Sequence, residues 1–197
     1  SGTDLKVEDT GNDVMLGIKT EYHGATVIAD THLFGKHNLD NVRAAMAVGL
    51  FFDVPLDDVI EAIKNYRPGN NRSQVVVTER NTIICDSYNA NPSSMKRALV
   101  SFSEMKSAKK MIILGDMLEL GSESLKEHQA VLSEAVNLEV GEVILCGPLF
   151  SMAAADKPFR HAADVKELRD IIGRINPEGY SILVKGSRGM MLEKVYE

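Results

Sequence analysis

Residues 81–95, NTIICDSYNANPSSM, combine an apolar run, a polar loop and the start of a helix. The short apolar run, TIIC, predicts a buried strand. Asn91 and Pro92 suit the N-cap and the first position of a helix, so a helix is predicted to begin at Pro92. The residues between carry an acid, a phenol, amides and hydroxyls. A loop that only connects two elements does not need so many hydrogen-bonding groups, so we expect loop 86–94 to border a site.

The C-terminal part of the chain repeats this order of strand and helix. SQVVVT (73–78) and TIICD (82–86) flank ERN and predict an antiparallel hairpin. Further apolar runs predict strands at 110–115, 142–147 and 180–186. Helical stretches lie between them, one with a capping box from Ser124 to Glu127 and another opening at Asp164. This alternation predicts an α/β fold: a Rossmann-like, mostly parallel sheet with flanking helices and an antiparallel hairpin.

The N-terminal part has a different pattern. Period-2 alternation over 13–19 and a second run over 25–33 predict two strands separated by a turn. A helix is predicted within 35–52, and another, with acids in its first turn, over 56–66. The apolar stripe of the first helix is expected to consist of Val42, Ala45, Met46, Gly49 and Phe52.

A domain boundary is predicted where these two patterns meet. The segment RPGNN, residues 67–71, combines proline, glycine and asparagine, which is strong turn chemistry. We therefore expect a small α+β domain over 1–68 and the α/β domain over 69–197.

Composition narrows the class of protein. Apolar residues make up 44% and charged residues 25% of 197 residues, and the net charge is −6 without a Lys/Arg block. We expect a globular protein that binds no nucleic acid and does not insert into a membrane, because no apolar run approaches the roughly 20 residues that span a bilayer. The N-terminus lacks the features of a signal peptide. Cys85 and Cys146 each end an apolar run and are expected to be buried free thiols of a cytoplasmic protein.

Ligands of open α/β sheets bind beyond the carboxyl ends of the strands. Loops 86–94, 115–124 and 185–189 follow such ends and are polar, glycine-bearing or both. KGSRG (185–189) sets a cation, a hydroxyl and a guanidinium before a helix N-terminus, which suits a phosphate or a carboxylate. A turn with solvated charges is the alternative. His128 is expected to be structural.

Other candidates lie before these loops. Asn38 and Asn41 are three residues apart, so their carboxamides face one side of a first helical turn and suit the edge of a nucleobase. In the alternative, one amide caps the helix and His37 is incidental. Arg72 suits a phosphate or a surface ion pair. Asp86 suits ribose hydroxyls or the cap of a turn.

Several catalytic motifs are missing from the sequence. It has no P-loop, no H-E-x-x-H, no CxxC pair and no nucleophile elbow. We therefore predict no metal site. The polar groups look like the walls of a nucleotide and small-substrate site without its phosphate-activating centre.

Taken together, these segments resemble one family, the Mur ligases. The resemblance rests on GKHNLDNVRAAMAVG, NNRSQ, ICDSYNANPSSM, LGDMLELGSES, the following histidine and LVKGSRGMMLE, in that order. It covers nearly all of residues 13–197 and implies that 1–68 is the end of a central ATP-binding domain. Residues 69–197 then resemble the complete C-terminal ligase domain. The P-loop and the Mg²⁺ ligands of the family are expected in a part of the protein that this chain lacks.

The resemblance also implies a reaction. It is ATP-dependent amide ligation in cytoplasmic peptidoglycan precursor synthesis, which serves cell-wall biogenesis, cell shape and cell division. The substrates are ATP, D-alanyl-D-alanine and a UDP-muramoyl tripeptide, whose carboxylate becomes an acyl phosphate that the dipeptide amine attacks. We expect a monomer, and a chain that is inactive alone. The alternatives are a related Mur or folylpolyglutamate-type ligase with another amino acid, and a non-catalytic nucleotide- or amino-acid-binding module.

The same resemblance assigns roles to individual residues. On the ATP side it implies His37, Asn38, Asn41, Arg72 and Asp86. On the dipeptide side it implies Tyr88, Asn89, Asn91, Ser94, Ser187 and Arg188. Arg72 and Lys185 are implied to be catalytic, and no metal ligand is implied.

Overall fold

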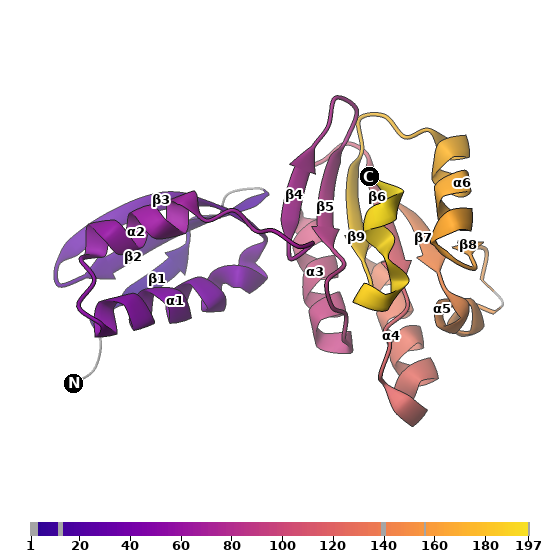
Figure 1. Cartoon of the computed structure of the whole chain (residues 1–197), viewed down its shortest axis with the longest axis horizontal. Helices are drawn as coiled ribbons and strands as arrows, with labels where there is room; N and C mark the ends of the chain where they lie inside the picture. Colours follow the sequence, from indigo (N-terminus) through magenta and orange to yellow (C-terminus); the bar gives the residue numbers. More distant parts are fainter. Residues whose placement is uncertain (1–3, 12–13, 139–140, 156, 197) are drawn as a thin grey trace. The chain divides into compact units, whose positions relative to one another are not determined.

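The structure is a computed structural model that describes residues 4–11, 14–138, 141–155 and 157–196. The chain divides into two compact units, Ser1–Pro68 and Gly69–Glu197. Figure 1 shows the first in indigo to purple and the second in magenta to yellow. Each unit has its own sheet.

The first unit is a three-stranded antiparallel sheet with two helices. Its strands, β1 (Lys6–Asp9), β2 (Met15–Tyr22) and β3 (Ala25–Phe34), pair in chain order, and a 3₁₀ turn η1 (Lys36–Asn38) leads into α1 (Leu39–Phe51) and then α2 (Leu56–Asn65). The predicted strands and helices are confirmed, whereas β1 was not predicted. Asp13, where the first predicted strand begins, lies outside the described residues.

The apolar stripe predicted for α1 is only partly buried. Val42 and Met46 pack into the core of the first unit, against Leu16 and Ile18 of β2. Ala45 is exposed, and Phe52 follows the end of the helix with 71% of its surface exposed. Helical spacing alone does not say how far a core extends, so only Val42 and Met46 of the predicted stripe are buried in it.

The second unit contains the predicted α/β sheet. Its six strands have the order β4-β5-β9-β6-β7-β8, and β4 (Gln74–Val77) pairs antiparallel with β5 (Thr82–Asp86) as the predicted hairpin. The other neighbours pair in parallel. The four remaining strands of the order given above are β6 (Lys110–Gly115), β7 (Glu142–Cys146), β8 (Arg160–Ala162) and β9 (Ser181–Lys185). The short β8 was not predicted.

Helices cover both faces of this sheet, as predicted. The helices are α3 (Pro92–Glu104), α4 (Ser124–Asn137), α5 (Pro148–Ala153) and α6 (Val165–Ile175), and the 3₁₀ turns are η2 (Gly121–Glu123), η3 (Arg188–Met190) and η4 (Leu192–Val195). In Figure 1, α6 and the yellow C-terminal segment lie in front of the sheet, and α3 and α4 lie behind it. Alternate strand residues face the two layers: Ile83 and Cys85 join Leu168 of α6 in one cluster.

Of the two helix starts predicted from capping residues, one is confirmed and one is wrong. Asp164 caps α6 through its side chain, which accepts a hydrogen bond from the Glu167 amide, so the predicted helix start is confirmed. The capping box from Ser124 to Glu127 is wrong. A 3₁₀ turn, η2, precedes α4, so Ser124 is already helical and the N-cap is Glu123, without a side-chain cap bond. The helix α5 was not predicted, because six residues are too short for a periodic signal.

Both cysteines are free and buried, as predicted. Burial raises the pKa of the Cys85 thiol to about 11 and the pKa of the Cys146 thiol to about 12. Within the described ranges, no helix combines the length and apolar character needed to cross a bilayer.

Candidate functional site

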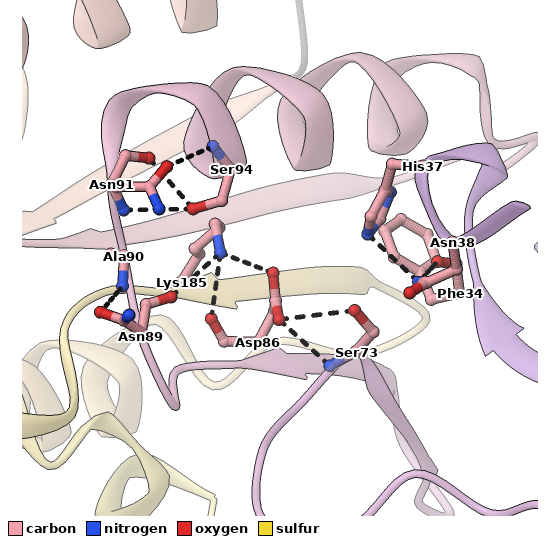
Figure 2. Close-up of polar contacts among 10 residues, drawn as sticks. All are labelled: Phe34, His37, Asn38, Ser73, Asp86, Asn89, Ala90, Asn91, Ser94 and Lys185. Carbon is pink, nitrogen blue, oxygen red and sulfur yellow. Dashed lines mark hydrogen bonds and ion pairs between the residues drawn. The ribbon is translucent and has the colours of Figure 1, made fainter. Parts of the chain in front are cut away.

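The candidate site lies where β5 and β9 end. These parallel neighbours set Asp86, the last residue of β5, opposite Lys185, the last residue of β9. Loops 86–94 and 185–189 therefore leave the same edge of the sheet, which places most of the predicted dipeptide-side residues at that edge. Figure 2 shows this junction in close-up.

Asp86 and Lys185 form a buried ion pair at the centre of the edge. Lys185 Nζ donates to Asp86 Oδ2 at 2.6 Å, and the two side chains are 2% and 16% exposed. The other carboxylate oxygen accepts from the Ser73 amide at 3.1 Å. Lys185 also lies 3.4 Å from the carbonyl of Asn89. Both charged groups thus already have partners, and their predicted catalytic and ribose-binding roles stay predictions.

In the DSYNANPSS loop, the side-chain oxygens of Asn89 and Asn91 are bonded locally, whereas their side-chain nitrogens are not. Asn91 Oδ1 accepts from the Ser94 amide at 2.9 Å, and Ser94 Oγ accepts from the Asn91 amide, so these two predicted substrate residues form the capping box of α3. Asn89 Oδ1 accepts from the Ala90 amide at 2.8 Å. Both asparagines are exposed, and their Nδ2 groups make no hydrogen bond within the described part of the chain. Two amide donors therefore face solvent from one loop.

Two predicted arginines meet at one phenol ring. The guanidinium carbon of Arg72 lies 3.5 Å from the centroid of the Tyr88 ring, and that of Arg188 lies 5.2 Å from it. A hydrogen bond from Arg72, and the positive charge behind it, lower the pKa of the Tyr88 phenol. The Tyr88 amide donates to the Asn71 carbonyl at 3.1 Å, which holds the ring beside the segment that carries Arg72.

Ser187 connects this edge to the loop after β6. Its Oγ accepts from the Leu118 amide at 2.9 Å, and its own amide donates to the Asp116 carbonyl at 3.1 Å. Ser187 is buried, so its hydroxyl holds the loop rather than facing solvent. The predicted helix N-terminus after KGSRG is only the three-residue 3₁₀ turn η3, which provides no helix dipole of consequence.

Asp116 is a site-supporting residue that was not predicted from the sequence. It is buried and its carboxylate accepts from the Leu149 and Phe150 amides at 2.9 and 2.8 Å, which caps the start of α5. The available signal was the one used for Asp86, an acid at the end of an apolar strand. Asp116 supports the loop that Ser187 joins and does not itself open to the edge.

His128 is structural, as expected. Its Nε2 lies 3.0 Å from the Met117 amide, which can only donate, so this nitrogen accepts and the proton is on Nδ1. Nδ1 then donates to the Ser124 carbonyl at 2.7 Å. The ring edge packs on Phe150 and the side chain is fully buried. His128 therefore fixes the loop after β6 from within.

The predicted adenine-side residues form a separate group in the first unit. Asn38 Nδ2 donates to the Phe34 carbonyl at 2.8 Å, close to His37 Nε2 (Figure 2). Asn41 Nδ2 donates to Asn38 Oδ1 at 2.9 Å. The two amides share one side of the first turn, as predicted, but Asn38 is 7% exposed and holds the turn. Asn38 is the N-cap residue of α1, as the alternative has it, but its side chain makes no cap hydrogen bond.

A metal site is not formed by the described residues alone. Within the described ranges, no group of three or more His, Cys, Asp or Glu side chains is placed to hold an ion.

Comparison with known proteins extends this description. The sequence model "Mur ligase, glutamate ligase domain" matches residues 71–188, more than half of the chain. The chain is similar to the UDP-N-acetylmuramoyl-tripeptide–D-alanyl-D-alanine ligase of Bacillus subtilis, with 35% identity over 175 residues, 83% of this chain and 38% of that protein. It thus spans well under half of this relative.

Solved structures share the fold. A crystal structure of MurF from Acinetobacter baumannii is 25% identical with a TM-score of 0.80, over 96% of this chain and 44% of that one. MurF of Thermotoga maritima, solved in complex with ADP, is 20% identical with a TM-score of 0.82, over 100% of this chain and 46% of that one. Together with the match to the family's sequence model, these findings show that the chain belongs to the Mur ligase family.

Proposed function

We propose that the chain is the C-terminal part of an ATP-dependent ligase that adds D-alanyl-D-alanine to a UDP-muramoyl tripeptide. The curated relatives bear the name of this reaction. The observation that supports it best is the pairing of β5 with β9, which brings loops 86–94 and 185–189 to one edge of the sheet. This edge presents amide donors and guanidiniums, the groups that a small polar dipeptide needs for recognition.

The dipeptide side of the proposal uses groups that remain available. D-alanyl-D-alanine has an amine, an amide and a carboxylate but little apolar surface. The exposed Nδ2 groups of Asn89 and Asn91 suit its amide carbonyl, and the Arg188 guanidinium suits its carboxylate. Ser94, Ser187 and Lys185 act on this side through the fold, since each already bonds within the edge.

Residues of each unit are assigned to the nucleotide separately. We assign 1–68 to the end of the central ATP-binding domain, with His37, Asn38 and Asn41 toward the base, and 69–197 to the C-terminal domain. Arg72 is assigned to the phosphates. Mg²⁺, which would neutralise phosphate charge, is assigned to residues outside this chain, because the described residues offer no ligand cluster of their own.

The proposed reaction has two steps. The terminal carboxylate of the tripeptide attacks the γ-phosphorus of ATP, which releases ADP and leaves an acyl phosphate. The dipeptide amine then attacks the acyl carbon, the C–O bond to phosphate breaks, and the amine loses a proton as the amide forms. Water competes in the second step, so the site must exclude it while the acyl phosphate is present. The substrates place the protein in the cytoplasm, and we infer a monomer.

The test uses the complete protein encoded by the gene. Phosphate release is measured with ATP, Mg²⁺ and UDP-muramoyl tripeptide, and D-alanyl-D-alanine is compared with L-alanyl-L-alanine and with single amino acids. We expect release that depends on D-alanyl-D-alanine. Release that requires another amino acid would favour a related ligase, and its absence with every acceptor would favour a binding module. The 197-residue chain alone is expected to release no phosphate, because its sequence has no P-loop.

A further inference from the structure

Arg72 and Arg188 are far apart in the sequence but share one aromatic neighbour. Their guanidinium carbons lie 3.5 and 5.2 Å from the centroid of the Tyr88 ring. Arg72 belongs to the segment before β4, Tyr88 to the loop after β5 and Arg188 to the loop after β9. One ring therefore connects three separate segments at the carboxyl edge.

This arrangement concentrates positive charge. Both arginines are exposed, and neither forms an ion pair with a carboxylate within the described ranges. The nearby Lys185 is neutralised by Asp86 at 2.6 Å. The protein as a whole has a net charge of −6, so two guanidiniums without an acid at one ring are not the result of a basic surface. The electron-rich face of the phenol is the group that offsets their repulsion.

Hydrogen bonds hold the backbone on either side of this contact. The Tyr88 amide donates to the Asn71 carbonyl at 3.1 Å, and Asn71 Oδ1 accepts from the Tyr196 hydroxyl at 3.0 Å. On the other side of Arg72, the Ser73 amide donates to Asp86. Ser73 has a positive φ of 51°, which a serine adopts only when the surroundings hold it there, and Asn71 has a φ of 57°, which asparagine tolerates. Arg72 is thus anchored on both sides beside the ring.

We propose that Tyr88 is a positioning residue that holds Arg72 and Arg188 as one pair and thereby couples the nucleotide side of the site to the dipeptide side. The inference rests on the proposed function, which assigns Arg72 to the phosphates and Arg188 to the dipeptide carboxylate. A ligand that draws one guanidinium away from the ring changes the environment of the other. Tyr88 then acts through both arginines and does not need to touch either substrate.

The kinetic test uses the complete enzyme with Tyr88→Ala and Tyr88→Phe. Tyr88→Ala removes the ring and is expected to raise the apparent KM for ATP and the apparent KM for D-alanyl-D-alanine by about two- to five-fold each. This is the range of an exposed cation–π contact. Tyr88→Phe keeps the ring and should recover most of this loss. Tyr180→Ala is the matched control, because its ring also lies near a cation, Lys109, but precedes β9 at the other edge of the sheet. The control should leave both constants unchanged.

A double-variant cycle tests the coupling itself. If Tyr88 acts through Arg72, the combined variant Tyr88→Ala/Arg72→Ala should cost clearly less than the two single losses together. Additive losses would overturn the proposal. It would equally be overturned if Tyr88→Ala left both constants at the wild-type value, or if only the stability of the protein changed.

A structural readout on the 197-residue chain separates this proposal from the proposed function. The side-chain Nε–H signals of Arg72 and Arg188 in a ¹⁵N spectrum should both shift in Tyr88→Ala, because the ring current is lost, and should stay near their positions in Tyr88→Phe. Unmoved signals would overturn the positioning role, whatever the enzyme does. If the complete protein shows no phosphate release that depends on D-alanyl-D-alanine, the proposed function fails, and the arginine signals still decide whether Tyr88 holds the pair.

Discussion

Asp86 and Lys185 end two neighbouring parallel strands in register, and their charged groups meet at 2.6 Å in the interior of the edge. Through its second oxygen, Asp86 also holds the Ser73 amide. One carboxylate thus joins the segment before β4, the end of β5 and the end of β9. The candidate site rests on this pair more than on any other contact of the edge.

Asp86→Ala is expected to destabilise the chain strongly. It leaves Lys185, whose side chain is 2% exposed, without its counter-charge, and breaking a buried pair in this way costs about 3–5 kcal/mol. Lys185→Met should cost less, because the Asp86 carboxylate is more exposed and keeps its Ser73 partner. The free energy of unfolding from urea denaturation measures both. A loss below about 1 kcal/mol for Asp86→Ala would contradict this account of the pair.

Asn91→Asp separates the two functions of this asparagine. The aspartate can accept the Ser94 amide as Asn91 does, so the cap of α3 and the stability should be preserved. It loses the exposed Nδ2 donor, and we expect the apparent KM for D-alanyl-D-alanine to rise by roughly 2- to 12-fold, the value of one hydrogen bond. Steady-state kinetics of the complete enzyme test this. An unchanged constant, with stability also unchanged, would show that Asn91 is only a helix cap.

Gly147→Ala and Gly173→Ala should change stability in opposite directions. At Gly147, φ is 110° and an added Cβ would collide with the Asp116 carboxylate, so we expect a loss of about 1–3 kcal/mol or more. At Gly173, inside α6, an added Cβ would meet nothing within 4 Å, and alanine should stabilise by about 0.5–1 kcal/mol. Thermal unfolding of both variants is the measurement. Equal shifts would contradict the close approach of Asp116 to the start of α5.

The two buried thiols predict a loss of stability at alkaline pH. Their pKa values are raised by burial from 9.0 to about 11 for Cys85 and to about 12 for Cys146. Above pH 9 the unfolded chain releases these protons while the folded chain retains them. The free energy of unfolding therefore falls as pH rises, by up to about 1.4 kcal/mol per pH unit for each thiol, and the contribution is fully present only below that window.

Cysteine variants isolate this effect. Cys85→Ala and Cys146→Ala should each flatten the decline of unfolding free energy between pH 9 and pH 11, whatever their stability at neutral pH. Urea denaturation at a series of pH values gives the slopes. Identical slopes in the wild type and both variants would show that the thiols do not titrate differently in the two states.

The elements that were predicted are those whose signals are local. The strands ending at Asp86 and Lys185 are continuous apolar runs, and the cap at Asn91 is set by neighbouring residues. The two elements missed in the second unit, β8 and α5, have three and six residues, too few for a periodic pattern. The capping box at Ser124 failed because a 3₁₀ turn had already begun the helix.

The roles of individual side chains were harder to predict, because they depend on tertiary partners. Topology brought Asp86 and the 185–189 loop to one edge, which sequence order and parallel pairing imply. No local pattern shows that Ser187 would bond the Leu118 amide, or that Asp116 would cap a helix thirty or more residues away. Such bonds decide which polar groups remain available to a ligand.

The placement of the dipeptide site is tested most directly by titrating the ¹⁵N-labelled 197-residue chain with D-alanyl-D-alanine and following its amide signals. We expect shifts at residues 86–94 and 185–189, on the edge where β5 and β9 end, and smaller ones with L-alanyl-L-alanine. Shifts confined to the opposite edge of the sheet, or none at a dipeptide concentration that saturates the complete enzyme, would contradict the placement of the dipeptide site.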